Sequence, residues 1–219
     1  MRRHGRGRMV VTAAAVATLA CALFLAWQLN YVPHPSHSSE ELGIERYQSP
    51  RDTDADGVDD QTDILESARA YVATRPRYQS RYYAGGWPDD GCGVCTDVVA
   101  RALLGAGIDL RALVAADVDA HPEAYGIAAP DPDIDFRRTQ VLTLYFERNA
   151  QVLTTDLSDV AAWQGGDVVM WEGHVGVVSD RRRSDGMPFV IHHWGPLQLR
   201  YEEDRLDDWG RIVGHYRLG

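Results

Sequence analysis

A cysteine and two later histidines have the residue types needed for nucleophilic catalysis. Cys95 begins an amphipathic helical pattern, and His174 and His192 lie on two later strand-like segments. A helix N-terminus carries partial positive charge and free backbone N–H groups, which favour a thiolate over a thiol. An imidazole takes the thiol proton and passes it to a leaving amine, while a third polar group orients that imidazole. The pattern therefore predicts Cys95 as nucleophile, His174 as base and His192 as the orienting group.

The third position has competitors along the chain. His193 follows His192 directly, and neighbouring residues of a strand face opposite sides, so only one of the two can point at His174. We expect His193 to face away from the site. Asp97 and Asp167 are further alternatives for the orienting role. Asp97 is explained more simply as a charge in the first helical turn, near the positive end of the helix dipole.

The segment Cys92-Gly93-Val94-Cys95 supports two other interpretations. A CxxC motif at a helix start is typical of thiol–disulfide oxidoreductases, and cysteines combined with histidines can bind zinc. A thioredoxin-type fold needs a strand before the motif, where residues 85–91 predict a loop, and it leaves both histidines without a role. A zinc site lacks a second CxxC or a closely spaced histidine pair. Hydrolysis is favoured, and both alternatives stay open.

Five blocks of sequence follow one another in the order found in a known enzyme superfamily. They are Tyr83-Ala84-Gly85-Gly86, Cys95 at a helix start, Gly166-Asp167-Val168-Val169, His174-Val175-Gly176-Val177-Val178 and Val190-Ile191-His192. Over about residues 62–219 the chain thus resembles the NlpC-type cysteine peptidases, papain-like bacterial enzymes that cut peptide bonds in peptidoglycan. Shorter sequence segments, including GVCTDVV, DPDIDFRR, IHHWG and IVGHYR, resemble those of a branch of secreted bacterial proteins of unassigned function. The superfamily usually has Asp-Cys-Ser-Gly at the nucleophile, and the different residues here leave the substrate more open than the reaction.

The resemblance implies a papain-like α+β fold, peptidoglycan stem peptides as substrate and no cofactor for catalysis. A matching tyrosine helps form the oxyanion hole in the resembling family, which points to Tyr83 beside the backbone N–H of Cys95. Arg137 or Arg138 has the chemistry to pair with a substrate carboxylate, although a helix start with surface arginines explains them equally well. A non-enzymatic alternative is a wall-binding domain built on an inactive peptidase fold.

The N-terminus has the features of a targeting segment. Four arginines precede an apolar run over residues 9–27, about as long as the 18–20 residues that cross a bilayer. By the positive-inside rule, residues 1–31 form a signal anchor in the cell membrane with the rest of the chain outside, or a cleaved signal of a secreted protein. Residues 32–51, with prolines, serines and charges, predict an extended linker that tethers the domain.

Residues 52–63 match the pattern of a calcium-binding loop. Alternate carboxylates would surround a hard cation, and Gly57 at the sixth position allows a sharp turn. The expected ligands are Asp52, Asp54, Asp56, the Val58 carbonyl and Asp63. Asp63 stands at the twelfth position, where glutamate is usual. A solvated acidic loop before the next helix is the alternative, but so many neighbouring carboxylates repel one another without a cation. We therefore expect a structural Ca²⁺.

The remaining pattern predicts an α+β domain over residues 64–219. Hydrophobic periodicity predicts helices near 62–74, 95–106, 109–119 and 136–149, and strands near 151–155, 167–172, 174–179, 188–194, 197–202 and 211–217. Helices first and strands afterwards indicate helices packed on an antiparallel sheet. The chain has 32 acidic and 22 basic residues. That acidic balance argues against nucleic acid as a partner.

Overall fold

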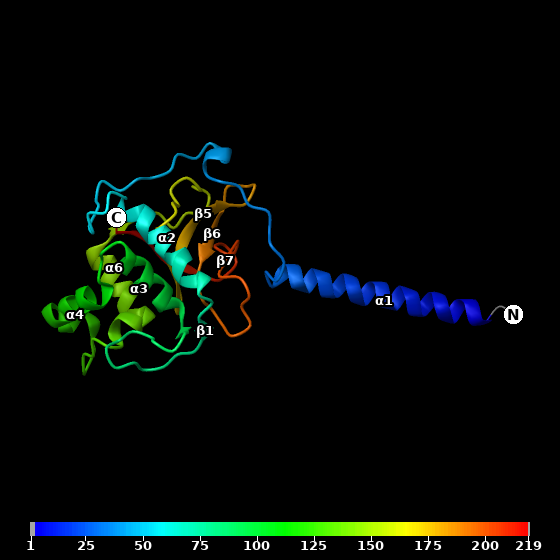
Figure 1. Ribbon diagram of the computed structural model, residues 1–219, viewed down its shortest axis with the longest axis horizontal. Coiled ribbons are helices and arrows are strands. Elements are labelled where there is room, and N and C mark those ends of the chain that lie inside the picture. Colours follow the sequence, from blue (N-terminus) through cyan, green and yellow to red (C-terminus); the bar gives the residue numbers. More distant parts are fainter. Residues whose placement is uncertain (1–2, 219) are drawn as a thin grey trace. The chain divides into compact units, whose positions relative to one another are not determined.

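The computed structural model describes the backbone of residues 3–218 and the side chains of residues 14–218. The chain divides into two compact units, Met1–Pro35 and Ser36–Gly219. The first unit contains helix α1, Arg3–Gln28 (Figure 1). The segment 9–27, expected to span a membrane, begins outside the described side chains. Among the helices of the described residues, none is both long enough and apolar enough to cross a membrane.

Helices make up the first half of the second unit, as the hydrophobic periodicity predicts. They are α2 (Asp60–Ala73), α3 (Cys95–Gly105), α4 (Leu110–Ala120), α5 (Pro122–Tyr125) and α6 (Thr139–Asn149), with short 3₁₀ turns η1 (Glu40–Leu42) and η2 (Asp135–Arg137). The side chains of Asp59 and Asp109 accept backbone N–H groups at the starts of α2 and α4. Such caps satisfy donors that a helix start leaves open.

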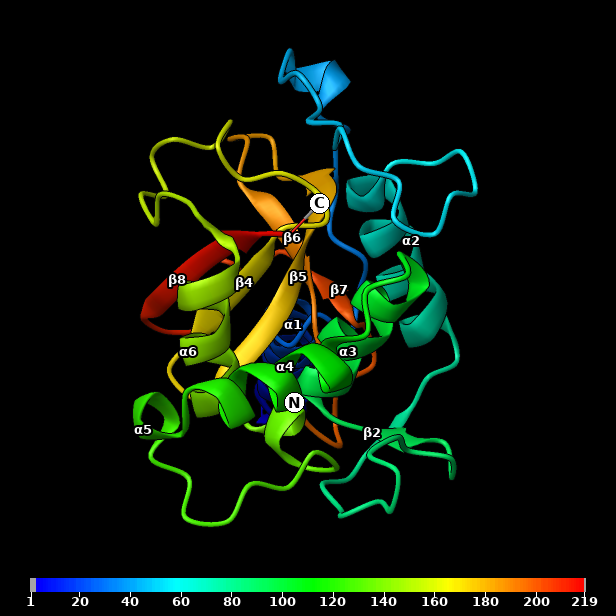
Figure 2. The ribbon, with the colours of Figure 1, turned by 90° about the vertical axis from the view of Figure 1, so that its left-hand side faces the viewer.

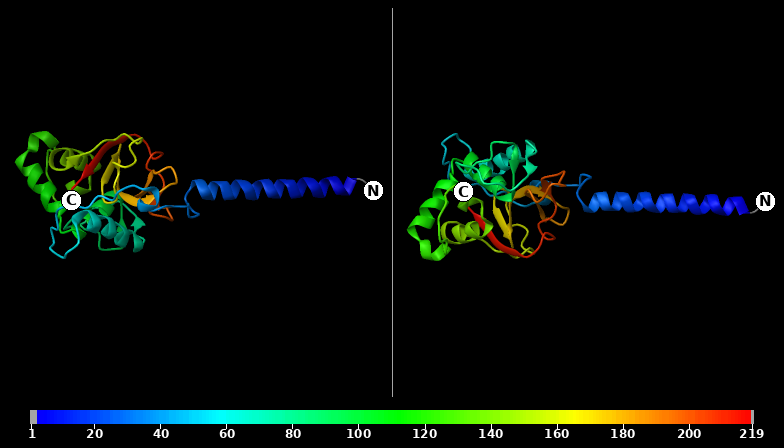
Figure 3. Two further views of the ribbon diagram at one scale, coloured as in Figure 1. Left: turned by 90° about the horizontal axis from the view of Figure 1, so that it is seen from above. Right: turned by 90° about the horizontal axis from the view of Figure 1, so that it is seen from below.

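Strands follow the helices and form an antiparallel sheet. They are β3 (Gln151–Val152), β4 (Val168–Trp171), β5 (His174–Arg182), β6 (Pro188–Ile191), β7 (Glu202–Glu203) and β8 (Ile212–Arg217). Within residues 3–218 they join in the order β3-β8-β4-β5-β6-β7, with each pair antiparallel. Both views of Figure 3 show the red strand β8 among the yellow strands. The α+β class and the antiparallel sheet are confirmed. Of the strand predicted over 197–202, residues 197–201 are loop and Glu202 belongs to β7.

Both faces of the sheet are buried, which explains why its central strands are apolar throughout. Along β4, Val168 and Met170 belong to the larger core under the helices, whereas Val169 and Trp171 belong to a second core on the other face. This is the alternation expected of a strand. Helix α3 packs on β5, and α2 packs on α3 (Figure 2). The helix that begins at Cys95 is thereby held against the strand that begins at His174.

Residues 37–49, near the start of the second unit, are hydrogen-bonded to later residues of the same unit. His37 exchanges two backbone hydrogen bonds with Arg182, at 2.8 and 2.9 Å, and Nε of Arg182 donates to Ser39 Oγ at 2.8 Å. Further along, the N–H of Tyr47 donates to the side-chain oxygen of Gln164 at 3.0 Å. These contacts differ from the free, extended linker expected over 32–51, because partners from distant residues hold polar groups that composition alone assigns to water.

Candidate active site

Three side chains form a continuous hydrogen-bonded series at the end of the sheet. Nε2 of His174 lies 2.9 Å from Nδ1 of His192, and Nε2 of His192 lies 2.8 Å from Oε2 of Glu203. His174 begins β5, His192 follows the last residue of β6, and Glu203 ends β7. Adjacent antiparallel strands therefore bring together residues that are far apart in sequence. The sequence analysis named both histidines but missed the glutamate.

Cys95 lies at the first position of α3, beside the start of β5. Its Sγ is close to the backbone N–H groups of Val175, Thr96 and Cys95 itself. Val175 directly follows His174, so the thiol and the imidazole share one end of β5. The hydrogen bonds of residues 14–218 do not include one between Cys95 and His174. Catalytic hydrogen bonds of this kind are commonly long before substrate binds.

Burial sets the protonation states of these groups. It raises the pKa of the Cys95 thiol to about 11, against the opposing effect of the nearby backbone N–H groups. Burial, and then the neighbouring His192 and His193, lower the pKa of His174 to about 2. Burial lowers the pKa of His192 to about 3. The resting pair is thus a neutral thiol and a neutral imidazole. The helix N-terminus does not by itself produce the thiolate that the sequence analysis expected.

Exposure separates the members of the site. Cys95 and His174 are each 8% exposed, whereas His192 is fully buried and Glu203 is 1% exposed. Cys95 and His174 thus keep a small exposed fraction, whereas the two groups behind them have almost none. This order fits a nucleophile and base at the surface, supported from the interior.

His193 differs from its expected orientation. It is 1% exposed, and its ring meets Tyr78 and Tyr201 edge-on, with centroids 5.1 and 4.9 Å apart. Strand alternation does not apply to it, because β6 ends at Ile191. His193 lowers the pKa of His174 after burial and His192, which places it near the site. Its Nδ1 is a buried nitrogen without a hydrogen-bond partner among the described residues.

The tyrosine near the thiol is Tyr78 rather than Tyr83. The pKa of Tyr78 is raised by burial and then by Cys95. The hydroxyl of Tyr83 instead donates to Asp90 at 3.0 Å, and the Arg137 guanidinium lies over its ring at 5.1 Å. Parallel pairing of β1 (Arg77–Tyr78) with β2 (Cys92–Gly93) brings Tyr78 to the start of α3. That pairing was not evident from so short a segment.

Arg137 is committed to Asp97 and is not open to a substrate carboxylate. Its Nε and Nη2 donate to the two carboxylate oxygens at 2.7 and 3.0 Å, and its Nη1 donates to the Arg81 carbonyl at 2.7 Å. Asp97 also accepts a hydrogen bond from the backbone N–H of Val94 at 2.8 Å, which fixes the residue that precedes α3. Both side chains are buried. The pair holds the nucleophile helix in place, so the substrate-binding role expected for Arg137 is not supported.

Asp167 belongs to a separate buried cluster. Its carboxylate accepts from His215 Nε2 at 2.9 Å and from two nitrogens of Arg217 at 2.7 and 2.8 Å. It also accepts from Gln61 Nε2 at 2.9 Å. Because these contacts occupy both oxygens and none comes from His174, the alternative role of Asp167 as orienting residue is not supported. The hydrogen bond of His174 is instead with His192.

Comparison with known proteins places most of this chain in one family. A model described as "Domain of unknown function (DUF1287)" matches residues 65–218. The chain belongs to the DUF1287 family. An Escherichia coli (strain K12) protein described as "Uncharacterized protein YijF" is 39% identical over 167 residues, which cover 70% of this chain and 80% of that protein. No solved structure matches. Every residue of the site, from Cys95 to Glu203, lies within the DUF1287 domain.

The first cysteine of the CxxC motif in the DUF1287 domain, Cys92, contacts other groups than Cys95 does. Cys92 Sγ lies 3.6 Å from the side-chain oxygen of Gln79, and Cys92 lines a pocket of about 500 Å³ with Tyr71 and Arg101. Cys92 and Cys95 are free thiols. Among residues 14–218, the only group of three or more His, Cys, Asp or Glu with ligand atoms within 4.8 Å of one another is Asp52, Asp54 and Asp56. The zinc arrangement on the cysteines and histidines is therefore not formed.

The acidic loop precedes the DUF1287 domain. The exposed carboxylates of Asp52, Asp54 and Asp56 lie together, and backbone N–H groups at 56–58 donate to them at 2.8–3.3 Å. Burial and then Asp56, Asp54 and Asp52 raise the pKa of Asp63 to about 6. One oxygen of Asp63 is buried without a hydrogen-bond partner among the described residues. Asp52, Asp54 and Asp56 thus gather, whereas Asp63 lies outside this close group but near enough for their charges to raise its pKa.

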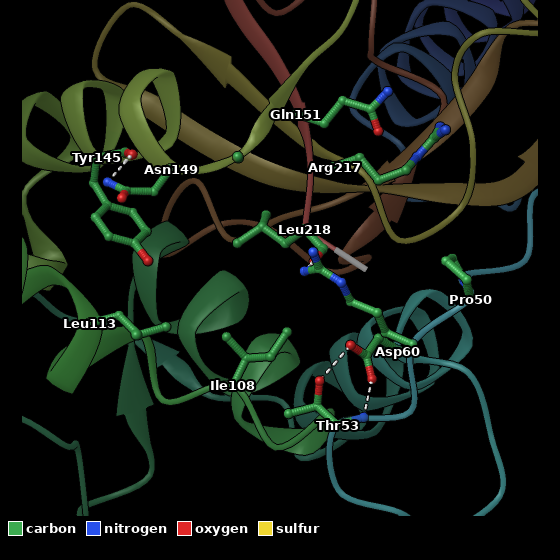
Figure 4. Close-up of a pocket in the computed structure, with 12 residues that line it drawn as sticks. Pro50, Thr53, Asp60, Ile108, Leu113, Tyr145, Asn149, Gln151, Arg217 and Leu218 are labelled. Atoms are coloured by element: carbon green, nitrogen blue, oxygen red, sulfur yellow. Dashed lines mark hydrogen bonds between the residues drawn. The ribbon is translucent and has the colours of Figure 1, made fainter.

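A pocket of about 400 Å³ lies away from the site, at the side of the domain where β8 ends (Figure 4). It is lined by Asp60, Tyr145 and Arg217 among others, and the Asp60 carboxylate accepts from the backbone and hydroxyl of Thr53. Its lining does not include Cys95 or the residues bonded to His174. We assign it no role in the chemistry.

The raised pKa of Cys95 predicts slow alkylation at neutral pH. An acid with a raised pKa stays protonated until the pH approaches that value, and only the thiolate reacts. We expect the rate with iodoacetamide to rise about tenfold per pH unit between pH 7 and 10. Time-resolved mass spectrometry measures it, with the Cys95→Ala variant correcting for the other two thiols. A plateau below pH 8 would instead show a stabilised thiolate.

Gly176 permits β6 to approach β5 at the site. A Cβ added there would lie 2.7 Å from Val190 Cγ2, 3.1 Å from the Ile191 carbonyl oxygen and 3.2 Å from His192 Cβ. Backbone cannot move aside cheaply, so Gly176→Ala is expected to destabilise the fold by about 1–3 kcal/mol. Denaturant unfolding checks this. Gly195→Ala is the matched control, because nothing lies within 4 Å of its added Cβ; equal effects would contradict the steric explanation.

Proposed function

We propose that the domain is a thiol hydrolase that cleaves peptide or amide bonds, with Cys95 as nucleophile and His174 as general base. The observation that carries the proposal is the series His174–His192–Glu203, which begins beside a cysteine at a helix start. A base oriented by a second group next to a nucleophile is the arrangement expected of covalent catalysis. The motif order shared with NlpC-type cysteine peptidases supports the same chemistry.

In the proposed reaction the thiol proton moves to His174 as Sγ attacks the carbonyl carbon. The resulting oxyanion is stabilised by the backbone N–H of Cys95, with the Tyr78 hydroxyl as a second donor. His174 then gives the proton to the leaving amine, the C–N bond breaks, and a thioester remains. Water, deprotonated by His174, attacks the thioester; the proton returns to Sγ as the acid leaves. Proton transfer coupled to attack suits a neutral resting pair.

A peptide of the cell wall is the substrate class we propose. Support comes from the resemblance and from a pocket of about 420 Å³ beside the site, whose lining includes Trp171 and Gly173. Gly173 precedes His174 in the chain, and the Trp171 ring lies 5.6 Å from the His174 ring. Glu147 and Glu172 give the pocket an acidic lining. Acidic walls favour an amine-bearing peptide over another carboxylate.

The test is incubation of the protein with purified peptidoglycan in water enriched in ¹⁸O, followed by mass spectrometry of the released fragments. Hydrolysis of a peptide or amide bond places ¹⁸O in a new carboxyl group, and this is the expected result. Retention on the wall material without new ends would favour the binding-module alternative. Reduction of a disulfide substrate without hydrolysis would favour the oxidoreductase alternative. Either outcome would overturn the proposal.

We also propose a structural Ca²⁺ bound by Asp52, Asp54, Asp56, Asp63 and the Val58 carbonyl. The unpartnered Asp63 oxygen and the clustered carboxylates support it. Calcium that binds only the folded state raises the melting temperature in proportion to the logarithm of its free concentration above Kd. We expect chelation to lower the melting temperature and Asp54→Asn to remove that dependence. A melting temperature indifferent to calcium and chelator would contradict the site.

A further inference from the structure

Glu203 is a buried carboxyl group with hydrogen-bond partners on three sides. Its Oε2 lies 2.8 Å from His192 Nε2, 3.1 Å from Trp194 Nε1 and 3.3 Å from Gln198 Nε2. An indole N–H and an amide NH₂ can only donate, so Oε2 is an acceptor toward both. Burial raises the pKa of Glu203 to about 7, and the donors aimed at Oε2 oppose that shift because they favour the charged form.

The orientation of Gln198 is fixed independently. The backbone N–H of Trp194 donates to its side-chain oxygen at 2.9 Å, and its Nε2 also donates to the His192 carbonyl at 3.1 Å. The backbone N–H of His192 donates to the Tyr201 carbonyl at 2.8 Å. The segment between β6 and β7 is thus folded around the His192–Glu203 contact and positions both partners.

A carboxylate acceptor determines which ring nitrogens carry hydrogen. Burial keeps both imidazoles neutral, so each ring has a single N–H. Charged Glu203 can only accept, so His192 must then carry its hydrogen on Nε2, which leaves Nδ1 of His192 as an acceptor. His174 must then donate from Nε2, and its Nδ1 is left with a free lone pair. Reversal of the His192 tautomer would place hydrogen on Nδ1 of His174 and block it as a base.

We propose that Glu203 is a positioning residue that acts through His192 to hold His174 in the tautomer whose Nδ1 takes the proton of Cys95. The inference rests on the proposed hydrolase function and extends it from a pair of histidines to a four-residue series. When Nδ1 of His174 receives the thiol proton, the new positive charge is stabilised through His192 by the Glu203 carboxylate. Glu203 itself touches no substrate, because it is buried behind both histidines.

The direct test is long-range ¹H–¹⁵N NMR of the protein labelled in its histidines, at a fixed pH of about 9, where Glu203, whose pKa burial raises to about 7, is charged. The chemical shifts distinguish protonated from unprotonated ring nitrogens. We expect Nε2–H and unprotonated Nδ1 in both His174 and His192. In Glu203→Met the acceptor is lost, and we expect the Nδ1–H form to appear in both rings. Hydrogen on His192 Nδ1 in the wild-type protein, or unchanged tautomers in Glu203→Met, would overturn the proposal.

Two further variants separate positioning from simple folding effects. In Glu203→Gln the amide oxygen should occupy the Oε2 position, because Trp194 and Gln198 donate there, so the tautomers persist. Glu202→Gln is the matched control: Glu202 neighbours Glu203 on β7 but contacts Arg69 and Ser179 instead. We expect its tautomers to match the wild-type protein. Loss of the wild-type tautomers in Glu202→Gln would show a general structural effect and overturn the assignment to Glu203.

Kinetics on a cleaved substrate gives the second readout. We expect Glu203→Met to lower kcat about 10²-fold or more with little change in KM, and Glu203→Gln to restore part of that loss. A raised KM with unchanged kcat would contradict a positioning role. Because NMR needs no substrate, the two proposals fail differently. Observation of the expected tautomers without any cleavage would contradict the hydrolase function alone. Cleavage with reversed tautomers would contradict the positioning role of Glu203 alone.

Discussion

Replacement of Cys95 with alanine is expected to lower kcat/KM for a peptide substrate by about 10⁴-fold or more while the fold survives. The thiol supplies the electron pair that forms the thioester, and a methyl group has none to offer. Cys95 is nearly buried in the larger core at the start of α3, and alanine is smaller and equally apolar. Activity should therefore fall without a comparable fall in the free energy of unfolding. Steady-state kinetics and denaturant unfolding on the same preparation measure both quantities.

Cys92→Ala is the matched control for that experiment. Cys92 is also a buried, free thiol three residues away, but its sulfur lies by Gln79 and a different pocket. We expect the Cys92→Ala variant to keep most of the activity. Equal losses in the two variants would show that the CxxC motif acts as a unit, which is the behaviour of a thiol–disulfide oxidoreductase. Full activity in Cys95→Ala would sink the hydrolase proposal.

The hydrophobic periodicity was enough to predict the elements that position the site. Strong apolar repeats gave α2, α3 and α4 within about two residues, and α6 apart from the 3₁₀ turn before it. The central strands were equally clear, because β4, β5 and β6 are buried on both faces and read as apolar runs. Short elements were not predictable. β1, β2 and β7 have two residues each, and their pairing depends on partners elsewhere in the chain.

The same limit explains which site residues were found. Cys95, His174 and His192 stand out because each begins or closely follows a strongly patterned element. Glu203 lies in an acidic stretch that looks like solvated surface, and only its pairing with β6, where Val190 faces it, carries it to the interior. A buried carboxylate needs donors, and those donors come from a loop whose conformation the sequence pattern does not specify. A search for acidic residues that follow His192 in the sequence would have raised Glu203 as a candidate.

Arg137→Met is expected to destabilise the domain by about 3–5 kcal/mol, because it leaves the Asp97 carboxylate buried without its partner. Both oxygens of Asp97 accept from Arg137 at 2.7 and 3.0 Å, and neither side chain has appreciable exposure. The double variant Asp97→Leu with Arg137→Met removes both charges. It should recover part of the lost stability, since a buried ion pair replaced by apolar groups is often nearly neutral. Denaturant unfolding of the four proteins gives the coupling energy.

Arg138→Met is the control, because it removes the neighbouring arginine from a partly exposed position. Arg138 pairs with Asp135 at 2.7 Å, three residues away, and its own side chain is 45% exposed whereas that of Asp135 is 2% exposed. Solvent screens the Arg138 charge, so its loss is expected to cost less stability than the loss of the buried Arg137. The comparison decides between two roles for Arg137. Loss of stability in Arg137→Met alone assigns it to the frame that holds the nucleophile helix. Unchanged stability with a raised KM for peptides would instead restore the substrate-binding role, since the arginine would then act on the ligand and not on α3.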